Sequence, residues 1–222
     1  MKNLKEFHNW LVNENNEIYS SFSVGDLKNI STNTPNIAQS VINRLEAYLK
    51  RRLGDPVGEG QYRIVWKINE TQIIKLAKNI EATKQNEEEI KNSKCIGEVY
   101  AVKVLDYEPN FFYWVIEENL IVPKEGIDNF FRKVLKMPIS SKELDTIFFI
   151  GVLAEKQGTA NFSKKAISIV SNYHNKLYSW NEWYTGLIDK LVKCKIDAND
   201  LHYENWGIRL GTETPVILDL GF

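Results

Sequence analysis

The sequence predicts an α+β protein in which a group of strands precedes a group of helices. Segment 58–68 alternates apolar and polar residues and is rich in β-branched side chains, which is typical of a strand, and 72–77 follows as a second strand. From Lys124 onward, apolar residues recur at helical spacing. The length of 222 residues suits one large domain or two small lobes that share a core.

The overall charge gives no general reason to expect a nucleic-acid or membrane partner. Lysine and arginine total 28 and aspartate and glutamate total 29, for a net charge of −1. The first residues are polar, and no apolar run suits a signal peptide or a bilayer span. Cys95 and Cys194 lie far apart and lack the spacing of a metal site, so we expect reduced thiols in a cytoplasmic protein.

An N-terminal helical extension is expected over residues 1–52. A short amphipathic helix is predicted over 4–11, followed by a loop over 13–34, which is rich in Asn, Ser and Thr. A longer helix then begins near Pro35 and ends near Gly54. We expect this extension to pack against the strands that follow it.

Residues 53–118 are expected to form a five-stranded antiparallel sheet with one helix. Residues 69–71 suggest a tight turn between two strands, and the acidic stretch 82–94 suggests the helix. The strand candidates are 58–68, which is a strand or a hairpin arm, and 72–77, 98–104 and 111–117.

Residues 119–222 are expected to be mainly helical. One helix is predicted over 127–135, a second from a capping box at Ser140 to about Glu155, and a long apolar stripe from Ala166 to Val192. The stripe is interrupted near 179–181, and His174 lies on or near it, where a hydrogen-bonded core histidine is the simplest interpretation.

The final stretch carries three polar residues that ordinary packing does not demand. It reads as a loop, a strand, a turn and a second strand, with Asp200 and Asn205 in the loop and Asp219 at the end of the second strand. Carboxylate and amide oxygens are hard ligands of the kind that Mg²⁺ prefers beside a bound phosphate. An Asx-rich hairpin without chemistry is the alternative interpretation.

These motifs together resemble the protein-kinase-like superfamily, and the form Asp-Leu-His is more similar to its aminoglycoside and small-molecule kinase branch. Asp200 and Asn205 match D-x-x-x-x-N, and Asp219 opens a D-L-G in place of D-F-G. Upstream, Lys75 follows Ile73–Ile74 as the strand lysine does in V-A-I-K, and the elements occur in kinase order. The resemblance implies a bilobal fold with a shortened helical C-lobe and extra N-terminal helices.

The resemblance also implies a role for each matched residue, with ATP and Mg²⁺ as cofactors. Lys75 would hold the α- and β-phosphates and pair with an acid of the following helix, for which Glu89 is our choice ahead of Glu88 and Glu87. Asp200 would orient the attacking hydroxyl and accept its proton. Gly58, Gly60 and Val65 would cover the nucleotide. Glu117 and Asn119, in the hinge segment, would contact the adenine edge. Asn205 and Asp219 would bind Mg²⁺.

Departures from the family pattern leave the substrate open. Arg63 stands where the third glycine belongs, and Asn199 replaces the arginine that reads a phosphorylated activation loop. The printed sequence ends just after D-L-G, so we expect that the phosphoacceptor, a protein Ser/Thr or a small hydroxyl compound, binds elsewhere or that a partner or second copy covers the shortened lobe. A pseudokinase-like nucleotide-binding or protein-interaction module is the alternative to an active phosphotransferase, and an unrelated α+β domain with accidental motifs is a third interpretation.

Overall fold

The computed structural model describes residues 22–32, 37–122, 127–139 and 141–220. The chain divides into two compact units. The first comprises the described residues up to Glu87 together with Val104–Asn119, and the second comprises Glu88–Lys103 and the described residues from Leu120 onward. The helix expected over 4–11 lies outside the described residues.

Unit 1 is built on a five-stranded antiparallel sheet with the order β1-β2-β3-β5-β4. The predicted α+β class and this sheet are confirmed, and they are the elements that the resemblance to the protein-kinase-like superfamily implied. Helix α4 (Thr83–Ile96) follows β3 in the chain. The strands are β1 (Gly58–Glu59), β2 (Arg63–Asn69), β3 (Gln72–Ala77), β4 (Val104–Tyr107) and β5 (Trp114–Glu118).

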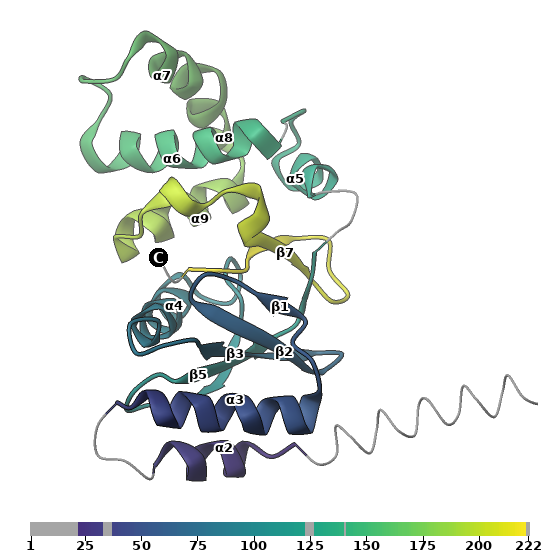
Figure 1. The fold of residues 1–222 in the computed structure, drawn as a ribbon. Coiled ribbons are helices and arrows are strands. Elements are labelled where there is room, and N and C mark those ends of the chain that lie inside the picture. Colours follow the sequence, from purple (N-terminus) through teal and green to yellow (C-terminus); the bar gives the residue numbers. More distant parts are fainter. Residues whose placement is uncertain (1–21, 33–36, 123–126, 140, 221–222) are drawn as a thin grey trace, which may run out of the picture. The chain divides into compact units, whose positions relative to one another are not determined.

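One face of this sheet packs against the N-terminal helices. Helix α3 (Gln39–Leu53) lies along the sheet and α2 (Val24–Ser31) lies outside it (Figure 1). The shared core contains Leu45 and Leu49 of α3 and, from the strands, Ile64, Trp66, Ile68, Ile74, Leu76, Trp114 and Ile116. The helix predicted to end near Gly54 is confirmed, since Gly54 follows α3 with φ 79°.

Helix α2 corrects the prediction of a loop over 13–34. Ser23 caps the helix by accepting a hydrogen bond from the Asp26 amide, and Leu27 is fully buried. The Ser31 hydroxyl donates to the Leu27 carbonyl and accepts a hydrogen bond from Trp114 Nε1. Tertiary packing therefore stabilises a helix whose polar composition suggests a loop.

The strand predicted over 98–104 is also wrong, because β4 begins at Val104. Gly97 adopts φ 89° at the end of α4, and the amides of Tyr100 and Ala101 both donate to its carbonyl. Beyond this turn the backbone makes two hydrogen bonds with Ile217. The Val102 amide donates to the Ile217 carbonyl, and the Ile217 amide donates to the Tyr100 carbonyl. The segment therefore pairs with the C-terminal strand of unit 2 and does not join the five-stranded sheet.

Unit 2 combines a helical core with a three-stranded antiparallel sheet. The predicted interruption of the long stripe is confirmed: Asn181 is extended and caps the next helix, and a π-helical turn lies further upstream. The helices are α5 (Asp128–Leu135), α6 (Ser141–Gln157), α7 (Lys164–Ile169), the π-turn η1 (Val170–His174), α8 (Asn175–Trp180) and α9 (Glu182–Cys194). The strands are β6 (Leu120–Ile121), β7 (Trp206–Arg209) and β8 (Pro215–Ile217).

The two cysteines form a disulfide, which corrects the expectation of reduced thiols. Cys95 in the last turn of α4 is bonded to Cys194 at the end of α9, with 5.9 Å between their Cα atoms. Folding brings together two positions that are 99 residues apart in the chain. Reduced cysteines were part of the basis for the cytoplasmic expectation, so this pair gives that expectation no support.

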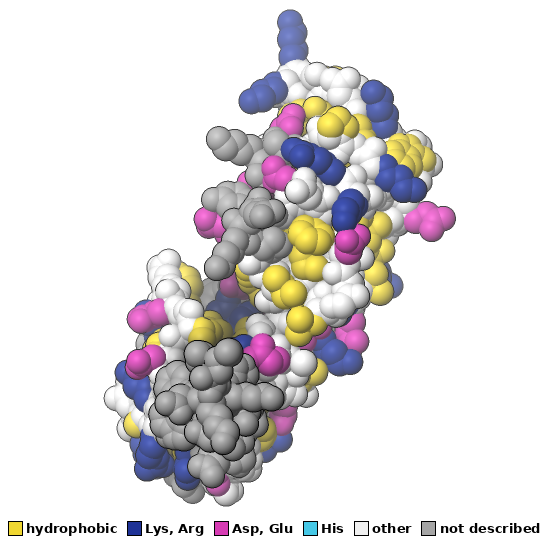
Figure 2. All heavy atoms as spheres, turned by 90° about the vertical axis from the view of Figure 1, so that its right-hand side faces the viewer, with side chains coloured by type: hydrophobic (Ala, Val, Ile, Leu, Met, Phe, Trp, Pro, Cys, Tyr) yellow, Lys and Arg dark blue, Asp and Glu magenta, His cyan; other side chains and the backbone are white. Residues whose placement is uncertain are grey.

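No helix among the described residues is both long and apolar enough to traverse a membrane. Basic and acidic side chains are interspersed over the face of the molecule in Figure 2.

Candidate functional site

The candidate site residues divide between the two units. In unit 1 the glycine-containing hairpin joins β1 to β2. Gly58 pairs with Val65, and the Gly60 amide donates to the Arg63 carbonyl. A Cβ added to Gly58 or Gly60 would find its nearest neighbour at 3.8 or 3.9 Å, so side-chain packing does not explain either glycine.

Lys78 secures this hairpin from the end of β3. Its ammonium donates to the Gly60 carbonyl at 2.9 Å and forms an ion pair with Glu59. The hydrogen bond from Lys78 lowers the pKa of the Glu59 carboxyl. The Lys78 side chain therefore ties the hairpin to the sheet through the Gly60 carbonyl. Gly58 and Gly60 have no side chains that could cover the backbone at these two positions.

Lys75 lies in the middle of the sheet as a buried cation. It pairs with Val65 on one side and with Val115 on the other, and it is 5% exposed. Its Nζ lies 2.8 Å from Oε2 of Glu117, which is fully buried in β5. A charge at this depth is costly unless it is paired, so the structure confirms a buried lysine and supplies an acidic partner on the neighbouring strand.

The expected hinge segment follows directly on β5. The Asn119 amide donates to the Thr71 carbonyl at 2.8 Å, and its side-chain nitrogen donates to the Glu70 carbonyl. Asn119 is thus tied to the turn between β2 and β3. Glu117 contributes its side chain to the Lys75 pair, a role that sequence reasoning missed when it considered only the backbone of this segment. The available signal was an acid within the apolar run of β5.

Helix α4 presents one of its three consecutive acids to the interior. Glu89 is fully buried, whereas Glu87 and Glu88 are exposed. The buried positions recur at helical spacing and are largely polar, comprising Thr83, Asn86, Glu89, Ile90, Ser93 and Ile96. Of the three candidates, the sequence-based choice of Glu89 therefore falls on the buried acid. Its pairing with Lys75 stays a prediction.

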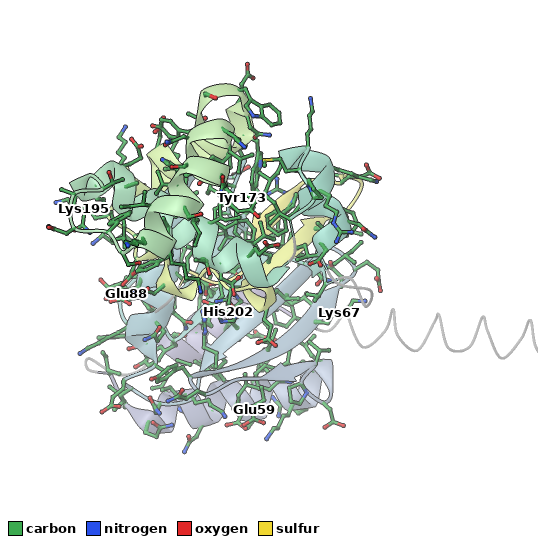
Figure 3. All side chains as sticks on the ribbon, turned by 90° about the horizontal axis from the view of Figure 1, so that it is seen from above. Glu59, Lys67, Glu88, Tyr173, Lys195 and His202 are labelled. Carbon is green, nitrogen blue, oxygen red and sulfur yellow. A yellow bond between two sulfur atoms is a disulfide. The ribbon has the colours of Figure 1, made fainter. Side chains whose placement is uncertain are left out.

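In unit 2 the loop that carries Asp200 consists of two short 3₁₀ turns. Asp200 ends the first, η2 (Ala198–Asp200), and Asn205 ends the second, η3 (Tyr203–Asn205). His202, which is labelled in Figure 3, lies between the two turns in the sequence. The Asp197 side chain caps η2 by accepting a hydrogen bond from the Asn199 amide. The loop therefore has a defined local fold.

Apolar anchors fix this loop to the core of unit 2. Leu201 and Trp206 are both buried, and Trp206 Nε1 donates to the Leu201 carbonyl at 3.2 Å. Trp206 also packs edge-on against Phe131 and stacks on Phe148. The bulky aromatic that follows Asn205 thus sets the position of the loop end.

The D-L-G segment lies beside the same loop end. The Leu218 amide donates to the Asn205 carbonyl at 2.7 Å. Asp219 is the residue after Leu218, so the backbone at Asn205 lies close to the backbone next to Asp219. Leu220 is fully buried, and its carbonyl accepts a hydrogen bond from Asn92 of α4 at 2.8 Å. Asp219 is half-buried between these two backbone anchors. The structure therefore brings together the two residues predicted to bind Mg²⁺.

The donor set at this loop end fits Mg²⁺ bound together with a phosphate. Asn205 and Asp219 offer an amide oxygen and a carboxylate, and Mg²⁺ is commonly held by one or two carboxylates, waters and substrate phosphate oxygens. Among the described residues, no group of three or more His, Cys, Asp or Glu side chains could hold a metal ion.

His174 is a core residue, as predicted. It is 2% exposed, with Nδ1 3.1 Å from the Tyr184 hydroxyl and Nε2 3.1 Å from a Glu155 carboxylate oxygen. Gly151 makes room for the cluster, because a Cβ there would meet the Tyr184 hydroxyl at 2.5 Å. This hydrogen-bonded cluster stabilises the junction of α6, η1 and α9.

No protein-family model matches the sequence, and no curated protein matches it. Among solved structures, the chain is similar to APH(2″)-IIa in its ternary complex with streptomycin and ATP. The similarity covers 85% of this chain and 72% of that chain, at 14% sequence identity and a TM-score of 0.37.

Proposed function

We propose that the chain is an ATP- and Mg²⁺-dependent phosphotransferase of the protein-kinase-like type. The observation that carries the proposal is the backbone hydrogen bond from the Leu218 amide to the Asn205 carbonyl, which joins one proposed Mg²⁺ ligand to the residue that precedes the other. A buried lysine in an antiparallel sheet and a hairpin with two glycines that packing does not require support the same function.

Each residue has a distinct task in this proposal. Gly58, Gly60 and Val65 cover the nucleotide, because a glycine backbone allows close approach to phosphate oxygens. Lys75 binds the α- and β-phosphates, and Glu89 is its predicted acidic partner on α4. The segment from Glu117 to Asn119 contacts the adenine edge.

The chemistry is positioning with neutralisation of charge. A hydroxyl oxygen of the acceptor attacks the γ-phosphorus, the bond between that phosphorus and the β–γ bridging oxygen breaks, and ADP leaves. Asp200 orients the hydroxyl and takes its proton. Mg²⁺, held by Asn205 and Asp219, supplies positive charge to the phosphates when it is bound.

The acceptor in this proposal is a hydroxyl of a protein Ser/Thr or of a small molecule. The nucleotide is the principal partner, and a protein partner or second copy of the chain at the helical unit belongs to the same proposal. Cytoplasmic location is proposed because ATP is the phosphate donor.

The test is transfer of label from γ-labelled ATP by the purified chain with Mg²⁺, alone and with a generic protein acceptor. We expect Asp200→Ala and Asp219→Ala each to reduce transfer by about a hundredfold or more, since each removes a group required in the transition state. Glu213→Gln is the matched control, because Glu213 is an exposed acid in the turn before β8 that pairs with Lys133.

The outcome separates the two functions that the residues allow. Transfer that is lost in both site variants and retained in Glu213→Gln supports the phosphotransferase. No transfer, with thermal stabilisation by ATP that disappears in Asp219→Ala, would instead favour a pseudokinase-like nucleotide-binding module. Neither transfer nor stabilisation would contradict both.

A further inference from the structure

The face of the five-stranded sheet opposite α3 carries a set of charged side chains. Side chains alternate between the two faces of a strand, so residues in register share a face. Val65, Lys75 and Val115 are in register across three strands, and Glu117 lies two residues beyond Val115 on the same face. Lys75 and Glu117 are therefore diagonal neighbours, in agreement with the 2.8 Å separation of their charged atoms.

Glu117 is the one carboxylate that the described strands β1–β5 place on this face. Arg63 and Lys67 of β2 share the face with Lys75, since they lie two residues on either side of Val65. Lys67 is engaged with Glu70 in the adjoining turn at 2.6 Å. The remaining strand acids, Glu59, Asp106 and Glu118, are in register with residues of the opposite face.

An apolar side chain at 117 would suit the stability of the sheet better than an acid. Both members of the pair are almost completely removed from water, and the desolvation of two charges offsets much of their attraction. A buried pair of this kind adds little net stability compared with well-packed apolar residues. A role that requires Lys75 to be charged and fixed explains the acid better than packing does.

We infer that Glu117 is a positioning residue for nucleotide binding: its carboxylate keeps the Lys75 ammonium charged and directed along this face of the sheet. The inference rests on the proposed function and extends it, because it assigns the strand acid a role beside that expected for Glu89. The Lys75 side chain is then already charged and oriented before the phosphates bind, which reduces the free-energy cost of ordering this side chain on binding.

Replacing Glu117 by Gln keeps the shape of the side chain and removes its charge. Loss of a neighbouring carboxylate lowers the pKa of a buried lysine, and the nearby cations Arg63 and Lys67 act in the same direction. In the variant, Lys75 is therefore expected to release its proton at lower pH than in wild type. Nucleotide affinity should follow the protonation of Lys75.

The experiment is calorimetric titration of Mg·ATP into wild type and Glu117→Gln at pH 6 and pH 8.5, with the ratio of the two Kd values taken at each pH. We expect about tenfold weaker binding by the variant at pH 8.5, as for a lost hydrogen bond to a charged group, and a clearly smaller ratio at pH 6. Glu213→Gln, at an exposed acid that pairs with Lys133, is the control and should leave both values unchanged. Glu89→Gln is measured in parallel to separate the contribution of α4.

Unchanged or tighter binding by Glu117→Gln at both pH values would overturn the inference. Unchanged binding would mean that Glu117 does not contribute to nucleotide affinity, and tighter binding would mean that its carboxylate competes with phosphate for Lys75. A Kd ratio that is the same at both pH values would also overturn it. A purely structural defect would weaken binding equally at both pH values, because it would not depend on the protonation of Lys75.

Thermal unfolding separates failure of this inference from failure of the proposed function. Lys75→Met and Glu117→Gln should each lower Tm by about 5 °C or more, and the double variant should be no less stable than either single one. Additive losses would mean that the pair does not exist in solution. If wild type binds no ATP, the proposed function fails and the nucleotide role of Glu117 fails with it, whereas a non-additive Tm series would still establish the pair.

Discussion

At the scale of single residues, burial distinguishes groups that sequence alone leaves equivalent. Three consecutive acids begin at Glu87, and Glu89 is the buried one. Helical spacing explains this result, because Glu89 shares a face with Asn86 and Ser93. The helical spacing in the sequence could therefore rank the three acids by expected burial. The ion pair between Glu117 and Lys75 depends on the register of two strands, which no local sequence pattern specifies.

The buried Tyr184 gives a residue-scale prediction about pH. Burial raises the pKa of its phenol above the ordinary value of 10.0. The unfolded chain therefore releases this proton at lower pH than the folded chain does, so stability is fully present below pH 10 and falls as the pH rises beyond it. At pH 10.5 the loss should be about 1 kcal/mol, or about 3 °C in Tm.

Tyr184→Phe tests this prediction through the difference in Tm between pH 8 and pH 10.5. The variant should be less stable at pH 8, since His174 loses its hydroxyl partner, but its Tm should fall less steeply at alkaline pH. Tyr62→Phe, at an exposed position, controls for the removal of one phenol. An equal alkaline fall in wild type and Tyr184→Phe would show that Tyr184 does not contribute to the slope.

At the scale of elements, the errors of sequence-based prediction share a cause. Helix α2 forms in a polar stretch because Leu27 and Ser31 find partners in the unit 1 core. Residues 100–102 look like a strand of the main sheet but pair with β8 instead. Both outcomes depend on contacts between segments far apart in sequence, which propensity and periodicity do not report.

The disulfide between α4 and α9 leads to an element-scale prediction. In the chain-entropy model, a cross-link that closes a loop of about 100 residues contributes about 4–5 kcal/mol. Reduction should therefore lower the Tm of wild type by about 10 °C or more. The double variant Cys95→Ser/Cys194→Ser should unfold at the temperature of the reduced wild type and should be insensitive to the reductant.

Thiol counting by mass spectrometry under non-reducing conditions provides the direct check of the bond. An intact wild-type protein should alkylate at neither cysteine until it is reduced, because Cys95 and Cys194 are the two cysteines of the chain. Two freely alkylated thiols in the folded protein would contradict the cross-link between Cys95 and Cys194.

At the scale of the whole molecule, the order of elements was the most predictable feature. The hairpin with Lys75, the helix with Glu89, and the loop–strand–turn–strand at the C-terminal end were all expected from the sequence, and each is present. Turn chemistry and periodicity are local signals, and they sufficed for these elements. The anchors that fix Asn205 and Asp219, above all Trp206 and Asn92, follow from the tertiary fold and could not be read locally.

The central claim is that the chain binds a magnesium nucleotide, and its most direct measurement is the Mg²⁺ dependence of ATP binding by calorimetry. For wild type we expect binding that strengthens by about tenfold or more when Mg²⁺ is added, and for Asp219→Asn an affinity that Mg²⁺ no longer improves. Glu213→Gln should behave like wild type. Binding by Asp219→Asn that keeps the full Mg²⁺ dependence, or no binding by wild type under any condition, would contradict the claim.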